Sequence, residues 1–125
     1  MSNKDHLSRL HRAMMKKDLH QISDSLAAGD SIDELDRERR TILFYAVKDN
    51  ELDIVASLIA GGANLNWQDA NLETPLHFAA RGYQVEAASL LISAGATVNV
   101  QDKFGNTALS HAVFHSRGRA EMIRL

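Results

Sequence analysis

Hydrophobic, small and hydroxyl-bearing positions recur along the chain at one fixed period. This period is the spacing between Thr41 and Thr74, and again between Thr74 and Thr107. The hydroxyl column is Ser8, Thr41, Thr74 and Thr107; the leucine column is Leu10, Leu43, Leu76 and Leu109; the alanine column is Ala13, Ala46, Ala79 and Ala112. A fixed period of this length indicates a repeat architecture, in which each unit buries its apolar face against the next unit.

The start of the third unit predicts a short helix. Thr74 is a suitable N-cap and Pro75 suits the first helical position. The positions that follow at helical spacing are apolar or small, so they form a narrow buried stripe; they are Leu76, Ala79 and Ala80. Gly82 ends this helix.

The rest of the unit predicts a second helix and an extended hairpin. The second helix begins near Val85, carries one apolar face and ends at Gly95 as a C-cap. Residues 96–107 alternate between apolar and polar positions and contain Asp102 and Gly105, which favour a turn. Each unit is therefore expected to be helix, turn, helix and hairpin.

The stretch "TPLHFAA" followed by "LLISAGATVNVQDKFGNTAL" resembles the ankyrin repeat in both motif and period. The resemblance is strongest in the third unit, good in the second and degenerate in the first. It implies a mostly α fold, an ankyrin-repeat solenoid of about four stacked helix-turn-helix units with projecting hairpin loops. The expected single domain spans residues 1–125, with units 8–40, 41–73, 74–106 and a partial unit 107–125.

Two departures from the family pattern bear on local shape. The turn glycine of the hairpin is kept as Gly105 but is replaced by Arg39 and Leu72, so we expect those two turns to differ in shape. The glycine between the helices is shifted to Gly82, beside Tyr83.

The end of the sequence departs from the repeat as well. Residues 114–118 add an insertion, and Met122, Ile123 and Leu125 would end the stack without a polar cap. We expect either a monomer or weak self-association through this end. The alternative is that the chain is a fragment or scaffold segment of a longer ankyrin array.

Composition narrows the class of partner. The net charge is −2, from 14 basic and 16 acidic residues, which gives no reason to expect nucleic acid or an anionic membrane. The chain has no cysteine, no signal-peptide pattern and no apolar run of membrane-spanning length. A cytoplasmic location is the resulting expectation.

His77 is the first candidate for chemistry, and its column argues for a structural role. The equivalent positions hold His11, Phe44 and Ser110, and a catalytic group would not be replaced by phenylalanine in the next unit. The resemblance implies that His77 bonds to the cap threonine and nearby backbone, tying helix to hairpin. We expect no catalytic residue and no enzyme activity.

His111 and His115 have the spacing of two metal ligands on one helical face. They have no third ligand in the pattern, so a small metal-dependent enzyme is only a remote alternative, and no metal or cofactor is expected. The charged run at residues 36–40 mixes both signs, which favours a solvated hairpin tip.

Positions that vary between units are free to determine which partner is bound. Two such columns share a face of the first helix, which the resemblance places on the concave side, and others lie at the hairpin tips. Aromatic and arginine side chains are frequent there, as at protein interfaces. The expected partner-binding residues are Arg37, Glu38, Arg40, Tyr45, Lys48, Trp67, Asn71, Phe78, Arg81, Tyr83, Lys103, Phe104, His111 and Phe114. Trp67 is equally compatible with packing against the hairpin stems.

The expected function is therefore a non-catalytic protein–protein interaction module that binds another protein through its concave face and hairpin tips. A small ankyrin protein of this kind resembles an inhibitor or adaptor, including the immunity proteins that neutralise toxins.

Overall fold

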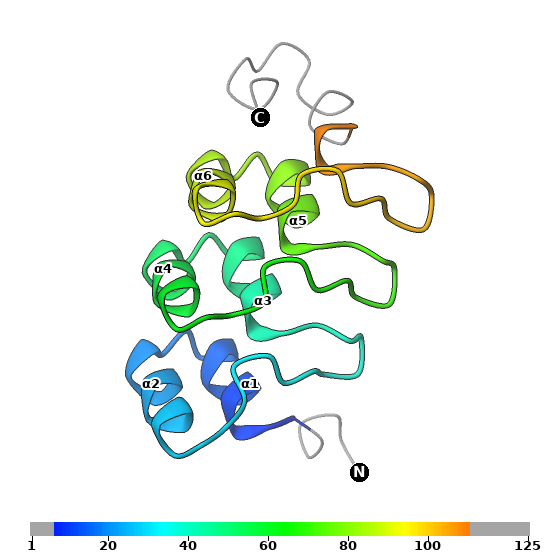
Figure 1. The fold of residues 1–125 in the computed structure, drawn as a ribbon. Helices are drawn as coiled ribbons and strands as arrows, with labels where there is room; N and C mark the ends of the chain where they lie inside the picture. Colours follow the sequence, from blue (N-terminus) through cyan, green and yellow to red (C-terminus); the bar gives the residue numbers. More distant parts are fainter. Residues whose placement is uncertain (1–6, 111–125) are drawn as a thin grey trace.

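The computed structural model describes residues 7–110, which form a stack of three helix pairs, each followed by a projecting hairpin loop (Figure 1). The helices are α1 (Arg9–Met15), α2 (Leu19–Ala27), α3 (Ile42–Lys48), α4 (Leu52–Ala60), α5 (Pro75–Arg81) and α6 (Val85–Ser93). Within these residues the hairpins contain turns and extended chain but no β-strand. The mostly α solenoid expected from the sequence is confirmed.

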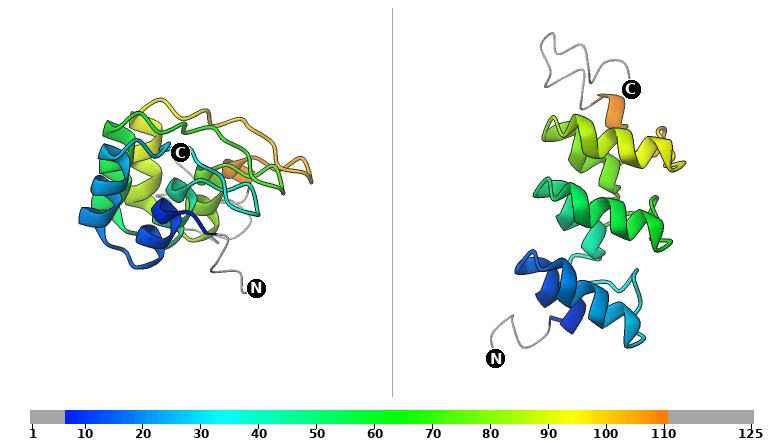
Figure 2. Two further views of the ribbon diagram at one scale, coloured as in Figure 1. Left: turned by 90° about the horizontal axis from the view of Figure 1, so that it is seen from below. Right: turned by 90° about the vertical axis from the view of Figure 1, so that its left-hand side faces the viewer.

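The short helices α1, α3 and α5 form an inner row, with α2, α4 and α6 on one side and the hairpins on the other (Figures 1 and 2). Neighbouring inner helices contact one another, and α4 also contacts α6. Ala46, Ala79 and Ala80 are fully buried in this row. Their small side chains allow the inner helices to approach closely, which explains the alanine column.

Thr74 and His77 fix the start of α5. The Thr74 hydroxyl accepts a hydrogen bond from the His77 backbone N–H, and Nδ1 of His77 accepts one from the Thr74 N–H at 3.1 Å, which completes a capping box. Nε2 of His77 donates to the carbonyl of Asn106 at 2.8 Å. This bond ties α5 to the following hairpin, so the structural role expected for His77 is confirmed.

The first unit repeats this arrangement, and the second lacks it. The Ser8 hydroxyl caps α1 by accepting a hydrogen bond from the His11 backbone N–H, and Nε2 of His11 donates to the carbonyl of Arg40 at 3.0 Å. Phe44 takes the equivalent place in the second unit, where the buried Thr41 hydroxyl has no hydrogen-bond partner in the described part of the chain. The unpaired hydroxyl is the consequence of replacing the histidine by a ring without nitrogen.

An aspartate shapes each hairpin turn. Its Oδ1 accepts backbone N–H bonds, at 2.9 to 3.0 Å, from the residues two and four positions further on; the three aspartates are Asp36, Asp69 and Asp102. Successive hairpins are also linked, because Ala70 N–H donates to the Glu38 carbonyl and Lys103 N–H to the Asn71 carbonyl. The hairpin tips are thus held in a regular row beside the inner helices.

The three hairpin turns have the same shape, so the expectation that two of them would differ is wrong. Arg39, Leu72 and Gly105 all take left-handed conformations, with φ of 61°, 60° and 81°. Each donates its N–H to the aspartate carbonyl three positions earlier, at 2.9 to 3.0 Å. The aspartate bonds and the links between hairpins determine the turn, and the non-glycine residues adopt a disfavoured backbone conformation within it.

The turn between α5 and α6 also differs from the sequence interpretation. Gly82 has φ of −90°, a conformation open to any residue, whereas the left-handed residue is Tyr83, with φ of 55°. Lys17 and Asn50 take the same conformation in the first two units. Gly82 therefore does not supply the backbone freedom that this turn requires.

Leu72→Gly is expected to raise the free energy of unfolding by about 1 kcal/mol, because it removes the left-handed strain of a side chain that is 46% exposed. Gly105→Ala is the reciprocal change. A Cβ at Gly105 would meet nothing within 4 Å, so only backbone strain should act in this variant. Its free energy of unfolding should therefore fall by about as much as that of Leu72→Gly rises. Urea unfolding measures both, and a loss of stability in Leu72→Gly would contradict the assignment.

Candidate partner-binding face

The variable positions of the repeat belong to the inner helices and to the hairpin tips, which lie beside one another in the stack (Figure 1). We call the surface formed by these positions the inner face. It comprises Arg12, Met15, Tyr45, Lys48, Phe78 and Arg81 from the helices, with hairpin residues 36–40, 69–73 and 102–106. Met15 and Phe104 are its most exposed apolar side chains, at 69% and 77%.

Phe78 stands at the centre of the inner face but is only 7% exposed. Its ring packs edge-to-face on Phe44, with centroids 5.2 Å apart. The guanidinium groups of Arg40 and Arg81 each lie 5.0 Å from the Phe78 ring centroid, at cation–π distance. Phe78 therefore supports two arginines, and the arginines rather than the ring face solvent.

Buried carboxylates hold both arginines in place. Nε of Arg40 donates to Oδ2 of Asp69 at 3.0 Å, and Nη1 of Arg81 lies 2.8 Å from Oε2 of Glu73. The Asp69 and Glu73 side chains are almost fully buried, whereas the Arg81 side chain is 41% exposed. The positions of both cations are thus fixed before any partner arrives, which reduces the entropy lost on binding.

Tyr45 is fixed by acidic residues of the first hairpin. Its hydroxyl donates to Oδ2 of Asp36 and lies 3.1 Å from Oε2 of Glu38. Burial, and then the hydrogen bond to the Asp36 carboxylate, raise the pKa of the Tyr45 hydroxyl well above its usual value. The hydroxyl therefore stays protonated and acts as a donor throughout the physiological range.

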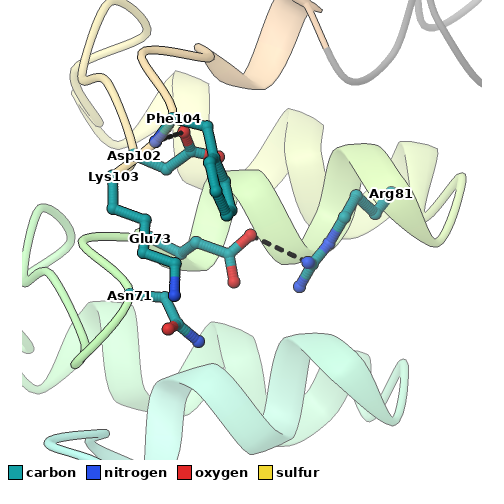
Figure 3. A pocket seen from close by; sticks show the side chains of 6 residues that line it. All are labelled: Asn71, Glu73, Arg81, Asp102, Lys103 and Phe104. Atoms are coloured by element: carbon teal, nitrogen blue, oxygen red, sulfur yellow. Dashed lines mark hydrogen bonds and ion pairs between the residues drawn. The ribbon is translucent and has the colours of Figure 1, made fainter.

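Two hollows open on the inner face. The C-terminal hollow, of about 190 Å³, is lined by Asn71, Glu73, Arg81, Asp102, Lys103 and Phe104 (Figure 3). In Figure 3 the carboxylate of Glu73 points toward Arg81 across this hollow, and Phe104 stands above it. The N-terminal hollow, of about 170 Å³, is lined by Leu7, His11, Met15, Asp36, Glu38 and Tyr45.

The two hollows are the same feature of the repeat, two units apart. Four lining positions correspond when the sequence is shifted by two repeat periods: Leu7 with Glu73, Met15 with Arg81, Asp36 with Asp102, and Glu38 with Phe104. Apart from the common aspartate, their chemistry is reversed. The N-terminal hollow has apolar helix-side residues and an acidic tip, whereas the C-terminal hollow has charged residues below and an aromatic ring at the tip.

The other residues expected to bind a partner have different surroundings. Trp67 is half-buried, donates from Nε1 to the Arg39 carbonyl at 3.1 Å and lies under the Arg39 guanidinium, so it packs on the hairpin stem. Lys103 lies over Phe104, with Nζ 5.1 Å from the ring centroid. Lys48 and Arg37 are exposed, and Asn71 and Tyr83 are half-buried. His111 and Phe114 lie outside the described residues.

Leu7 and Met15 line a hollow that sequence reasoning did not assign. Met15 lies at a variable position of the repeat but is not among the residues expected to bind a partner. Leu7 precedes residue 8, the expected start of the first unit. Leu7 lies one repeat period before Arg40, and this spacing was the signal that could have identified it.

The described residues offer little to the alternative classes of function. Within residues 7–110 there is no group of three or more His, Asp or Glu side chains placed to hold a metal ion. No helix in this range is long and apolar enough to cross a membrane. His115 and the C-terminal residues on which the metal-dependent and self-association alternatives depend lie outside it.

Comparison with protein-family models identifies ankyrin repeats, in three copies, over residues 10–102 and 53–125. The two ranges together cover nearly the whole chain. Comparison with curated proteins gives no match.

Proposed function

The chain belongs to the ankyrin-repeat family, whose repeats are in general non-enzymatic protein-interaction modules, and from this premise we propose that its inner face binds one partner protein. We further propose that binding occludes or stabilises that partner, so that the chain acts as a small inhibitor or adaptor, as a toxin-neutralising immunity protein does.

The observation that carries this proposal is the stack of Arg40, Phe78 and Arg81. Two guanidinium groups lie 5.0 Å from one ring, and each is held by a buried carboxylate. Arginine and aromatic side chains are the residues that most often dominate interface energetics, above all when they are held in place beforehand. The hollows on either side of the stack offer places for side chains of the partner.

The outer helices provide a matched surface that should not bind. Helices α2, α4 and α6 contain no lysine or arginine, and their exposed positions are mostly small or acidic. Ser57 and Glu86 are exposed positions on α4 and α6, so replacing them tests the outer surface without disturbing the core.

Tyr45→Ala and Arg81→Ala are each expected to weaken binding of the partner at least tenfold, because each removes a side chain fixed on the inner face. The partner would be recovered by co-purification with the intact chain from its own cells, identified and expressed alone, and its affinity measured by calorimetry. Ser57→Ala and Glu86→Ala should leave the affinity unchanged. Full affinity in both inner-face variants would show that the partner binds elsewhere.

The inhibitory role has a separate readout. If the chain occludes its partner, the partner's own activity should fall in proportion to the complex formed, and Arg81→Ala should restore it at equal concentrations. Full partner activity in the saturated complex would exclude inhibition and leave an adaptor role.

A further inference from the structure

Arg40, at the end of the first unit, lies against an aspartate of the second unit and an aromatic ring of the third. Arg40 lies over the Phe78 ring at 5.0 Å, and its Nε donates to Asp69 at 3.0 Å. Ring, aspartate and arginine together form a complete guanidinium site, in which the planar group stacks on an aromatic face and bonds to a carboxylate. The occupant comes from the chain itself.

The equivalent positions one repeat period earlier have the ring and the aspartate of this site but not the arginine. Tyr45 corresponds to Phe78, and Asp36 to Asp69, one repeat period apart. The position of Arg40 is taken by Leu7, which carries no charge. Both Tyr45 and Asp36 line the N-terminal hollow, of about 170 Å³. The N-terminal hollow therefore has two of the three groups that make up the guanidinium site.

One tip position of the first hairpin has a carboxylate where the second hairpin has an amide. Glu38 stands where the second unit has Asn71, and its side chain is 61% exposed. The Tyr45 hydroxyl lies within bonding distance of Asp36 and Glu38 but carries one proton, so it can donate to one of them at a time. Nη1 of Arg40 approaches Glu38 only to 3.9 Å. The rim of the hollow therefore retains carboxylate acceptors that a further cation can use.

We propose that the N-terminal hollow receives an arginine side chain of the partner protein, in the place equivalent to the one that Arg40 takes one repeat period later along the chain. The guanidinium stacks on Tyr45 and donates to Glu38 and to the remaining lone pairs of Asp36, while its aliphatic stem lies against Met15 and Leu7. This inference rests on the proposed function and adds the chemistry of one contact.

Arginine fits this hollow better than lysine does. A guanidinium is planar and weakly hydrated, and it donates in a fixed fork, so it can stack on the ring and bond to carboxylates at once. An ammonium group is a strongly hydrated point charge that cannot do both in the same way. The side chain found between the ring and the aspartate at the equivalent site is also an arginine, Arg40.

The test uses the intact chain and a small probe, so it needs no partner protein. N-acetyl-arginine methylamide is titrated while the resonances of Met15 and Tyr45 are followed by NMR, with N-acetyl-citrulline methylamide as the uncharged control of equal shape. The arginine probe should bind in the millimolar range, as expected for one side chain, and citrulline at least tenfold more weakly. Equal binding of the two probes, or no shift at either residue, overturns the proposal.

Two variants locate the probe. Glu38→Gln removes one carboxylate and should weaken the arginine probe about tenfold, whereas Glu86→Gln on α6 should not change its affinity. Leu7→Arg supplies the occupant from the chain itself and should abolish probe binding. Undiminished binding in Leu7→Arg places the probe elsewhere and overturns the proposal, while the effect of Arg81→Ala on the partner still tests the proposed function separately.

Discussion

Replacing His77 by alanine is expected to lower the free energy of unfolding by about 4 kcal/mol, a large share of the stability of a small domain. The imidazole is 1% exposed and connects α5 to the following hairpin. Its removal leaves a cavity between them and takes away the acceptor of the buried Thr74 N–H. Both effects act on the folded state, so the midpoint of urea unfolding should fall with little change in slope.

The second unit suggests the control for this prediction. His77→Phe places at this position the ring that Phe44 supplies one unit earlier, so it keeps the volume and removes only the hydrogen bonds. We expect a loss of about 2 kcal/mol, roughly half that of the alanine variant. Wild-type stability in His77→Phe would mean that the bonds to Thr74 and Asn106 contribute nothing net, contrary to the role assigned here.

The sequence predicted the parts of the fold that every unit must share. A stacked unit meets the same neighbour as the unit before it, so the residues at that contact recur at the repeat period and can be read directly. Thr74 belongs to such a recurring column. The helix start at Pro75 was predicted from local helix preference, and the bridging role of His77 was implied by the resemblance to the ankyrin repeat. All three are confirmed.

The same reasoning gave a wrong result where a local preference was taken to decide the shape. Leu72 and Arg39 were expected to alter their turns because neither favours a left-handed backbone. The aspartate bonds and the links between hairpins outweigh that preference, which costs only about 1–2 kcal/mol for each residue. The links between hairpins come from neighbouring units, and a local sequence pattern does not show them.

The candidate site, like the fold, could be predicted from the sequence only in part. The variable columns selected positions on the inner helices and hairpin tips, but they could not show that Phe78 is buried beneath Arg40 and Arg81. Nor could they show that the Arg40 guanidinium lies over the Phe78 ring and bonds to Asp69. Which side chain fills a hollow depends on rotamers and on contacts between units, and only a structure supplies both.

Asp69→Ala is expected to lower the free energy of unfolding by about 3 kcal/mol, because Asp69 joins the turn of the second hairpin to the inner face. Its Oδ1 accepts the N–H groups of Asn71 and Glu73, and its Oδ2 accepts from Nε of Arg40. The carboxylate is almost fully buried, so water cannot readily replace it. Urea unfolding measures the loss.

Asp69→Asn separates the turn from the ion pair, because the amide oxygen can still accept both backbone bonds while the negative charge opposite Arg40 is lost. We expect about half of the alanine effect, together with weaker partner binding, since Arg40 is then no longer held over Phe78. A double-mutant cycle of Asp69→Asn with Arg40→Ala should give a coupling energy of about 1–2 kcal/mol. Strictly additive effects would mean that Asp69 stabilises the hairpin alone and that Arg40 is held in place by the Phe78 ring without it.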